Sequence, residues 1–215
     1  MTYLEAVNRV LIRLREEEVT TVNQNSYSKL IGTFVNDAKR MVEDAWDWSS
    51  LRTTITVTTE ADVFSYNLLG TNSSFKTLDV LNDTKNCYME HIPSTEMNKL
   101  YLIQPVVEGP AQQYTWNGFS EAGNAIVDIY PKPNSVESLR FNIVQREDEY
   151  TDDADVFYVP TQAVIQLAQG FAMEERGETG GQSSGAMVQL GRSTLADAIA
   201  LDAARFPSET IWRDV

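Results

Sequence analysis

Residues 25–58, NSYSKLIGTFVNDAKRMVEDAWDWSSLRTTITVT, contain a change of apolar period that decides the fold. Over residues 27–48 the apolar side chains recur about every 3.6 positions, which is typical of an amphipathic helix. Over residues 51–58 they alternate with polar side chains, which is typical of a half-buried strand. The stretch therefore predicts a long helix followed at once by the first strand of a sheet.

A shorter helix is predicted before this stretch. Thr2 and Glu5 have the spacing of a capping box, in which each side chain bonds the backbone N–H of the other residue. The apolar face of this helix is Leu4, Val7, Val10, Leu11 and Leu14, and the other face carries Glu5, Arg9, Arg13 and Arg15. The longer helix is predicted to begin at Asn25 or Ser26. Its Gly32 costs about 1 kcal/mol relative to alanine, and we expect the close approach of another helix to require it.

The middle of the chain has the pattern of strands separated by short turns. Strand patterns occupy residues 51–58, 63–68, 76–81, 86–90, 112–116, 125–130 and 139–146. A short helix is predicted over residues 94–102, with Ser94 as its N-cap. Turns such as Asn117-Gly118 are short, so we expect the strands that they join to be antiparallel.

The rest of the sequence predicts two more helices around a glycine-rich loop. The first begins with Pro160, after an acidic stretch over residues 147–155, and ends near Gly177. Residues 177–185, GETGGQSSG, have the composition of a flexible connection. The second helix is predicted over residues 186–205. Its expected inner face is Leu190, Thr194, Leu195, Ala198, Ile199 and Ala203.

This order of elements predicts an α+β protein. Neither terminal pair of helices has partners enough to bury its apolar stripe alone. We therefore expect the two N-terminal and two C-terminal helices to pack as a four-helix bundle. The predicted domains are this bundle, residues 1–50 and 151–206, and an inserted antiparallel β-rich subdomain, residues 51–150. Residues 207–215 form a separate tail.

Composition excludes several classes of protein. The 215 residues include 31 acidic and 17 basic side chains, for a net charge of −14. Such a chain repels nucleic-acid phosphates and anionic lipids, so we expect no sequence-specific nucleic-acid partner and no membrane partner. The single cysteine, Cys87, and the single histidine, His91, exclude an internal disulfide and a multi-histidine metal site. We predict Cys87 to be a small buried hydrophobe and His91 to have a structural or surface role.

Three elements of the sequence together carry a resemblance. They are the opening pattern Leu4-x-x-Val7-Asn8-x-Val10-Leu11, the Trp46-x-Trp48 element before the first strand, and the turn Tyr130-Pro131-Lys132-Pro133. This layout resembles the podophage head-to-tail adaptors, the tail tubular protein A-like family. The resemblance implies a structural protein of the virion tail, assembled in the host cytoplasm. It also implies a ring, a dodecamer in the family, between the portal protein and the tail nozzle protein, with DNA leaving through its channel.

The segment around Pro207 supplies the predicted interface residues. In adaptors of this kind the end of the chain can reach into the neighbouring portal. Phe206, Ile211, Trp212 and Arg213 have the aromatic, aliphatic and cationic side chains typical of interface hot spots. We therefore predict that these four residues bind the portal, with tail fibres as a further candidate partner of the protein.

The sequence contains no recognised catalytic motif, so we predict that the protein is not an enzyme and has no cofactor. The sequence feature that most favours metal binding is the acidic stretch. Its carboxylates have the oxygen ligands that calcium accepts, and they belong to Asp148, Asp152, Asp153 and Asp155. The stretch lacks the glycine and the terminal glutamate of an EF-hand loop, so we predict no metal site. The alternative function is a calcium-dependent or carboxylate-based, tail-associated glycan hydrolase.

Overall fold

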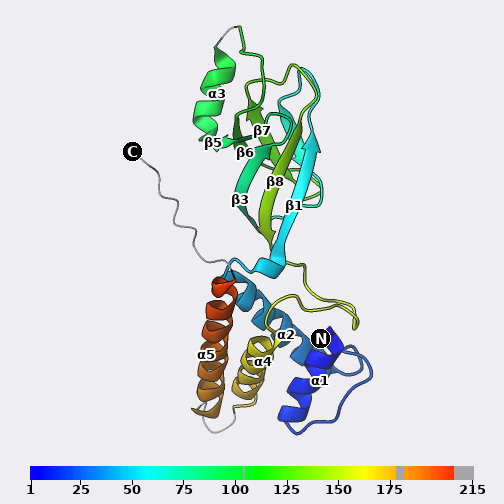
Figure 1. Cartoon of the computed structure of the whole chain (residues 1–215). Helices are drawn as coiled ribbons and strands as arrows, with labels where there is room; N and C mark the ends of the chain where they lie inside the picture. The colour runs from blue at the N-terminus through cyan, green and yellow to red at the C-terminus, as the bar shows by residue number, and fades with distance from the viewer. Residues whose placement is uncertain (104, 178–181, 206–215) are drawn as a thin grey trace. The chain divides into compact units, whose positions relative to one another are not determined.

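The computed structural model describes residues 1–103, 105–177 and 182–205, and it contains two compact units (Figure 1). The helical unit combines residues 1–51 with the residues from 147 onward, and the β unit is Arg52–Arg146. The N-terminal and C-terminal helices pack together, with two four-stranded sheets between them in sequence, so the predicted α+β class is confirmed. The finer division into domains at residues 50, 150 and 206 stays a prediction.

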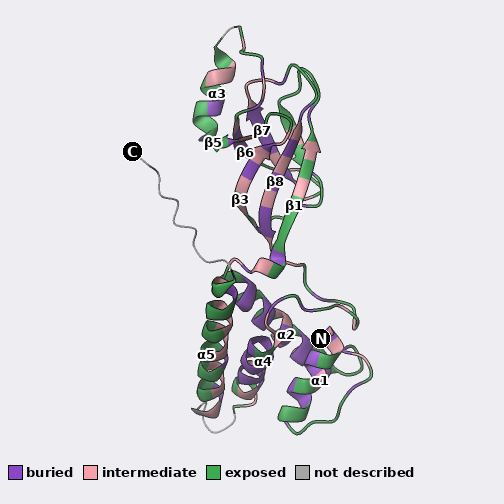
Figure 2. Cartoon of the chain, in the orientation of Figure 1, coloured by how far each residue is buried: buried purple, intermediate pink, exposed green. Residues whose placement is uncertain are grey.

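Helix α4 is the centre of the helical unit. The helices are α1 (Tyr3–Arg13), α2 (Ser26–Ala45), α4 (Thr161–Glu175) and α5 (Gln182–Ala204), and a 3-10 turn, η1 (Ser49–Leu51), follows α2. Helix α4 contacts each of the other three, and nine of its fifteen residues are buried. Figure 2 shows the consequence, because α4 is largely buried whereas α5 is largely exposed. Within the described ranges, no helix is long and apolar enough to cross a membrane.

Local hydrogen bonds at the N-caps mark where α1 and α2 begin. The predicted capping box is present, since the N–H of Thr2 donates to Glu5 Oε2 at 2.9 Å and the N–H of Glu5 donates to Thr2 Oγ1 at 3.3 Å. Asn25 caps α2 as predicted. Ser94, however, is the first residue of α3 (Ser94–Leu102) and not its cap. Pro93 is already extended at the N-cap position and makes no side-chain cap bond, so the prediction for Ser94 was wrong.

Glycines mark the closest contacts between helices. Gly32 packs against Tyr3 of α1 and against Val22, which is the close approach expected at this position. Helices α4 and α5 also meet at glycine, since a Cβ on Gly191 would lie 2.9 Å from Leu167. The line of contact on α5 therefore passes through Gly191. Leu190, which was predicted to be internal, therefore faces the surface and is 49% exposed. The other five residues of the predicted inner face are half-buried.

The β unit contains two sheets. The strands are β1 (Arg52–Thr58), β2 (Ser65–Leu68), β3 (Phe75–Asn82), β4 (Cys87–Tyr88), β5 (Glu90–His91), β6 (Gln113–Phe119), β7 (Ala125–Tyr130) and β8 (Ser138–Gln145). One sheet has the order β1-β8-β3-β4 and the other β2-β7-β6-β5. Their shared core includes Leu68, Val80, Met89, Ala111, Tyr114, Val127, Ile129, Leu139, Phe141 and Ile143. Strand β1 pairs with β8, so the first and last strands of the unit are neighbours.

Three expectations about the β unit were wrong. Residues 86–90 form β4 and β5 instead of one strand, because the chain changes sheets at Met89. The N–H of Met89 donates to Val80 in one sheet, and the next N–H, of Glu90, donates to Gln112 beside the other. Strand β5 then pairs with β6 in parallel, so the insertion is not purely antiparallel. Cys87, in two-residue β4, is half-buried instead of buried.

Candidate functional site: surfaces and polar network of the helical unit

The acidic stretch is docked on the helical unit by its own polar groups. We call residues 147–155 the acidic connector. Asp153 Oδ1 accepts the N–H of Val22 at 2.9 Å. Asp155 Oδ2 accepts two N–H groups of the connector itself at 2.9 Å each. These carboxylates therefore bond backbone amides, and in the part of the chain that the structure describes, no group of three or more His, Cys, Asp or Glu residues could hold a metal ion.

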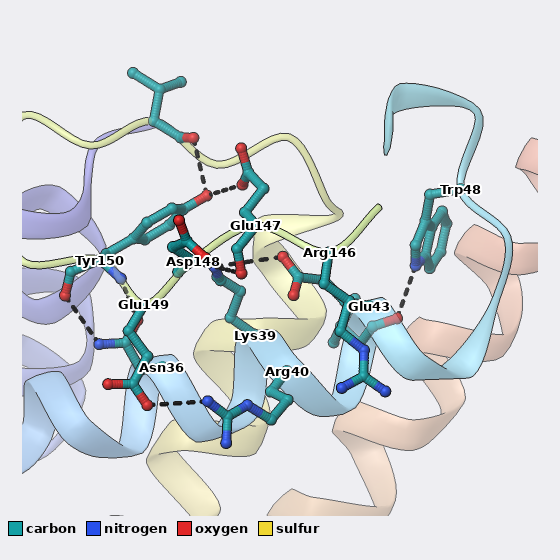
Figure 3. A network of polar contacts seen from close by, with 12 residues as sticks. Asn36, Lys39, Arg40, Glu43, Trp48, Arg146, Glu147, Asp148, Glu149 and Tyr150 are labelled. Atoms are coloured by element: carbon teal, nitrogen blue, oxygen red, sulfur yellow. Dashed lines mark hydrogen bonds and ion pairs between the residues drawn. The ribbon is translucent and has the colours of Figure 1, made fainter. Parts of the chain in front are cut away.

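A buried lysine of α2 donates hydrogen bonds to the backbone of the acidic connector (Figure 3). Lys39 is 2% exposed, and its Nζ donates to the carbonyl oxygens of Glu147 at 3.3 Å and Asp148 at 2.6 Å. The same Nζ lies 3.4 Å from Glu43 Oε1 and 4.0 Å from the centre of the Tyr150 ring. Two carbonyl oxygens, one carboxylate and one aromatic face thus replace the water that would surround an exposed ammonium group.

The partner carboxylate is buried as well. Glu43 lies one turn after Lys39 on α2 and is buried. Burial raises the pKa of Glu43, although the charge of Lys39 pulls this pKa in the other direction. Next to it, the indole N–H of Trp48 donates to the carbonyl of Val42 at 2.7 Å, which closes the end of α2. Trp48 itself is buried.

Tyr150 is the point where the connector enters this network. Its hydroxyl lies 2.5 Å from Glu147 Oε2 and 2.9 Å from the carbonyl oxygen of Val156. Its backbone forms a reciprocal pair with the Asn36 amide, at 3.0 and 3.1 Å. Burial is the largest cause of a raised pKa of the Tyr150 phenol, and the hydrogen bond to Glu147 and the charge of Glu147 raise this pKa further. The Tyr150 hydroxyl and the Lys39 Nζ both donate hydrogen bonds within this network, so the network fastens the connector to α2.

A second carboxylate joins the end of α2 to α5. Asp202 accepts the indole N–H of Trp46 at 3.1 Å, the N–H of Ser49 at 3.1 Å and the hydroxyl of Ser49 at 2.6 Å. Burial would raise the pKa of Asp202, but these hydrogen bonds and the nearby charge of Arg205 outweigh burial and lower it. Trp46 itself is 37% exposed, so it lies at the surface of the helical unit.

An apolar groove opens between α2 and α4. Its volume is about 640 Å³, and its floor consists of Phe34, Met41 and Phe171. Met41 is 41% exposed, and the two phenylalanine rings meet edge to face at 6.4 Å. The rim residues are Asp37, Arg40, Asp44, Glu174 and Glu175. We call this surface the α2/α4 groove, and its four carboxylates around an apolar floor suit an occupant that is both apolar and cationic.

The β unit exposes its own apolar residues around the end of α3. Leu102 is 79% exposed, Ile103 61% and Val107 53%. We call these three residues the α3 tip. His91 also belongs to this unit, where it is exposed in β5 with its ring 5.4 Å from that of Tyr114, and it has a surface role as predicted.

The predicted portal-binding residues, Phe206, Ile211, Trp212 and Arg213, lie outside the described residues. The sequence reasoning also missed the buried network. A usable signal was present, because Asn36, Lys39 and Glu43 follow one another at spacings of three and four and form a polar row beside the apolar stripe of α2.

A family model described as SU10 adaptor protein matches residues 1–208, which is nearly the whole chain. No curated protein matches the sequence.

Proposed function

The chain belongs to the SU10 adaptor protein family of phage head-to-tail adaptors, and we propose that it forms a ring that joins the portal to the tail nozzle. The family assignment makes it a structural component of the virion and confirms the resemblance to head-to-tail adaptors. The portal, the nozzle, the dodecameric state and the place in the tail are the proposed part.

The proposal is supported by two exposed apolar surfaces that belong to different units of the chain. The α2/α4 groove belongs to the helical unit, and the α3 tip belongs to the β unit. A protein that joins two other components needs at least two surfaces that do not compete with each other. Exposed apolar surface of this kind is typical of protein contacts. The pair of surfaces therefore suits a subunit that contacts more than one neighbour in an assembly.

The acidity of the chain is consistent with a channel for DNA. A net charge of −14 disfavours strong attachment to phosphates, because binding proteins gain affinity by placing Lys and Arg against the DNA backbone. A ring through which DNA passes must not hold the DNA. We propose that the adaptor contributes to the wall of the exit channel in this way, and that residues 206 and 211–213 reach the portal.

The alternative function, a glycan hydrolase, is overturned. The family is one of structural adaptors and not of enzymes. The structure adds a physical reason, since Asp153 and Asp155 of the acidic connector accept backbone N–H groups. Two of the four carboxylates that suggested calcium chemistry therefore act as local structural acceptors.

Electron microscopy of portal-bearing capsids tests the proposal. Capsids purified without this protein would be incubated with the full chain, and the symmetry of any added density at the portal would be determined. We expect a twelve-fold ring at the portal and, with nozzle protein added, tails only where the ring is present. Tails that attach equally well without the protein would contradict the adaptor role.

A further inference from the structure

The outer face of α1 is a small cationic surface on an acidic protein. The inner face of α1 is buried, with Ala6, Val7 and Val10 fully covered. On the outer face, Ile12 is 52% exposed, and Arg9 and Arg13 lie three positions before it and one after it. The guanidinium of Arg13 donates a hydrogen bond to Gln169 Oε1 of α4 at 3.4 Å. We call Arg9, Ile12 and Arg13 the α1 outer face.

This face and the α2/α4 groove are complementary. The face offers one exposed aliphatic side chain, Ile12, with the exposed side chains of Arg9 and Arg13 on the same helix and Glu5 as the acidic residue of the face. The groove offers an apolar floor with four carboxylates on its rim, and the one basic rim residue, Arg40, pairs with Glu149 at 3.0 Å. An aliphatic side chain can fill the floor while the arginines reach the rim, as expected of an interface with an apolar centre and a charged edge.

One chain does not bring the two surfaces together. Helix α2 contacts α1 through Gly32, which packs against Tyr3, and contacts the connector through Asn36 and Lys39. Phe34 and Met41 of α2 line the groove instead. Ile12 and Met41 both remain exposed in the single chain. Each copy therefore has one cationic surface and one acidic groove to offer.

We infer that the α1 outer face of one copy docks in the α2/α4 groove of a second copy. This inference rests on the proposed ring and names its subunit contact. The two surfaces differ, so the contact is head-to-tail, and repeated head-to-tail contacts close into a ring when the rotation between subunits permits. Two chains of charge −14 repel each other overall, and opposite charges facing each other at a contact offset this repulsion locally. The α1 outer face supplies the positive charges.

Charge exchange combined with cross-linking tests the inference. The full chain would carry Cys87→Ser, with Ile12→Cys and Met41→Cys as thiols at the centres of the two surfaces. A short bifunctional maleimide would be added to the protein alone at high concentration and to protein bound to portal-bearing capsids. We expect a ladder of covalent oligomers on a denaturing gel.

Two variants of this cysteine protein separate charge pairing from mere proximity. Variant one has Arg9→Glu and Arg13→Glu, and variant two has Asp37→Lys and Glu175→Lys. Each alone opposes like charges across the contact, so we expect the yield of oligomers to fall about tenfold. A mixture of the two restores opposite charges at every contact and should restore the ladder.

The matched control for variant one is Lys29→Glu with Lys99→Glu, which makes the same change in net charge as variant one at two exposed positions outside both surfaces. We expect it to leave the ladder unchanged. The inference is overturned if no ladder forms in either condition, if variant one cross-links as well as the control, or if the mixture stays as low as each variant. Capsids that bind variant one in a complete ring would overturn it while sustaining the adaptor role. Capsids that bind none of the proteins would contradict the adaptor role, and a charge-dependent ladder in free solution would still support the contact.

Discussion

The substitution Lys39→Met tests whether the buried network holds the acidic connector. Methionine keeps the length of the side chain and removes the ammonium group. The change leaves buried Glu43 without its cation and leaves the carbonyls of Glu147 and Asp148 without the donor that lies 3.3 and 2.6 Å away. Removing one partner of a buried ion pair costs about 3–5 kcal/mol of folding free energy.

The double variant Lys39→Met/Glu43→Leu separates the charge from the carbonyls. It removes the uncompensated carboxylate, so we expect it to be more stable than Lys39→Met alone by at least about 1 kcal/mol. It does not restore a donor for the two connector carbonyls. An unsatisfied buried acceptor costs about 1–3 kcal/mol, so the double variant should remain less stable than the unchanged protein.

The pH dependence has a definite sign. The folded-state pKa of Glu43 is raised above its ordinary value of 4.5, so protonation of Glu43 favours the folded state. This contribution is fully present below the unfolded pKa and is lost as the pH rises through the folded pKa. Without Lys39 the folded pKa rises further. The cost of Lys39→Met should therefore be larger at pH 7 than at pH 5.

Urea unfolding followed by tryptophan fluorescence measures these differences. A Trp116→Phe/Trp212→Phe background leaves Trp46 and Trp48 as reporters of the helical unit. The control is Lys29→Met, an exposed lysine of the same helix, for which we expect a change within about 0.5 kcal/mol. The reasoning is refuted if Lys39→Met costs no more than this control, or if its cost is the same at both pH values.

Three further predictions concern packing, the end of α2 and the tail. Gly191→Val brings a side chain against Leu167, where a Cβ alone would lie at 2.9 Å, and should lower the stability by about 1–3 kcal/mol in thermal unfolding; unchanged stability would contradict the close contact. Asp202→Ala should cost about 2–4 kcal/mol because its hydrogen bonds are lost, and since the pKa of Asp202 is lowered, the difference from the exposed-site control Asp197→Ala should shrink as the pH falls through that pKa. Deleting residues 208–215 should leave the melting temperature nearly unchanged but abolish capsid attachment. Wild-type occupancy of capsids would refute that role, and an unfolded truncation would place the segment in the core.

Local signals in the sequence predicted most of the element boundaries. The capping box of Thr2 and Glu5 and the cap at Asn25 depend on residues within three positions of each other, and both are present. Strand β7, Ala125–Tyr130, has its predicted bounds because turn residues end the pattern on both sides. Such features can be predicted from the sequence because residues close to one another in the chain determine them.

Features that depend on distant partners were not predicted. The strand pattern of residues 86–90 is continuous in the sequence, and only the two sheets on either side explain why it divides at Met89. The position of Leu190 depends in the same way on the neighbouring Gly191, which fits against Leu167. Burial of Lys39 requires the connector carbonyls, more than one hundred positions away in the sequence. The candidate surfaces share this difficulty, because the groove combines residues of α2 and α4.

The charge distribution predicts that salt has opposite effects on the long-range repulsion between copies and on the attraction at their contact. The net charge of −14 repels copies at a distance, and this repulsion is screened over about 10 Å at 0.1 M salt. Added salt should therefore promote association at first. The pairing of Arg9 and Arg13 with a carboxylate rim acts at contact and weakens as salt rises further. Association of the unchanged protein should thus pass through a maximum as salt increases, whereas the Arg9→Glu/Arg13→Glu variant should only gain. A steady increase for both in sedimentation velocity would mean that net repulsion alone governs assembly and that the α1 outer face contributes no attraction.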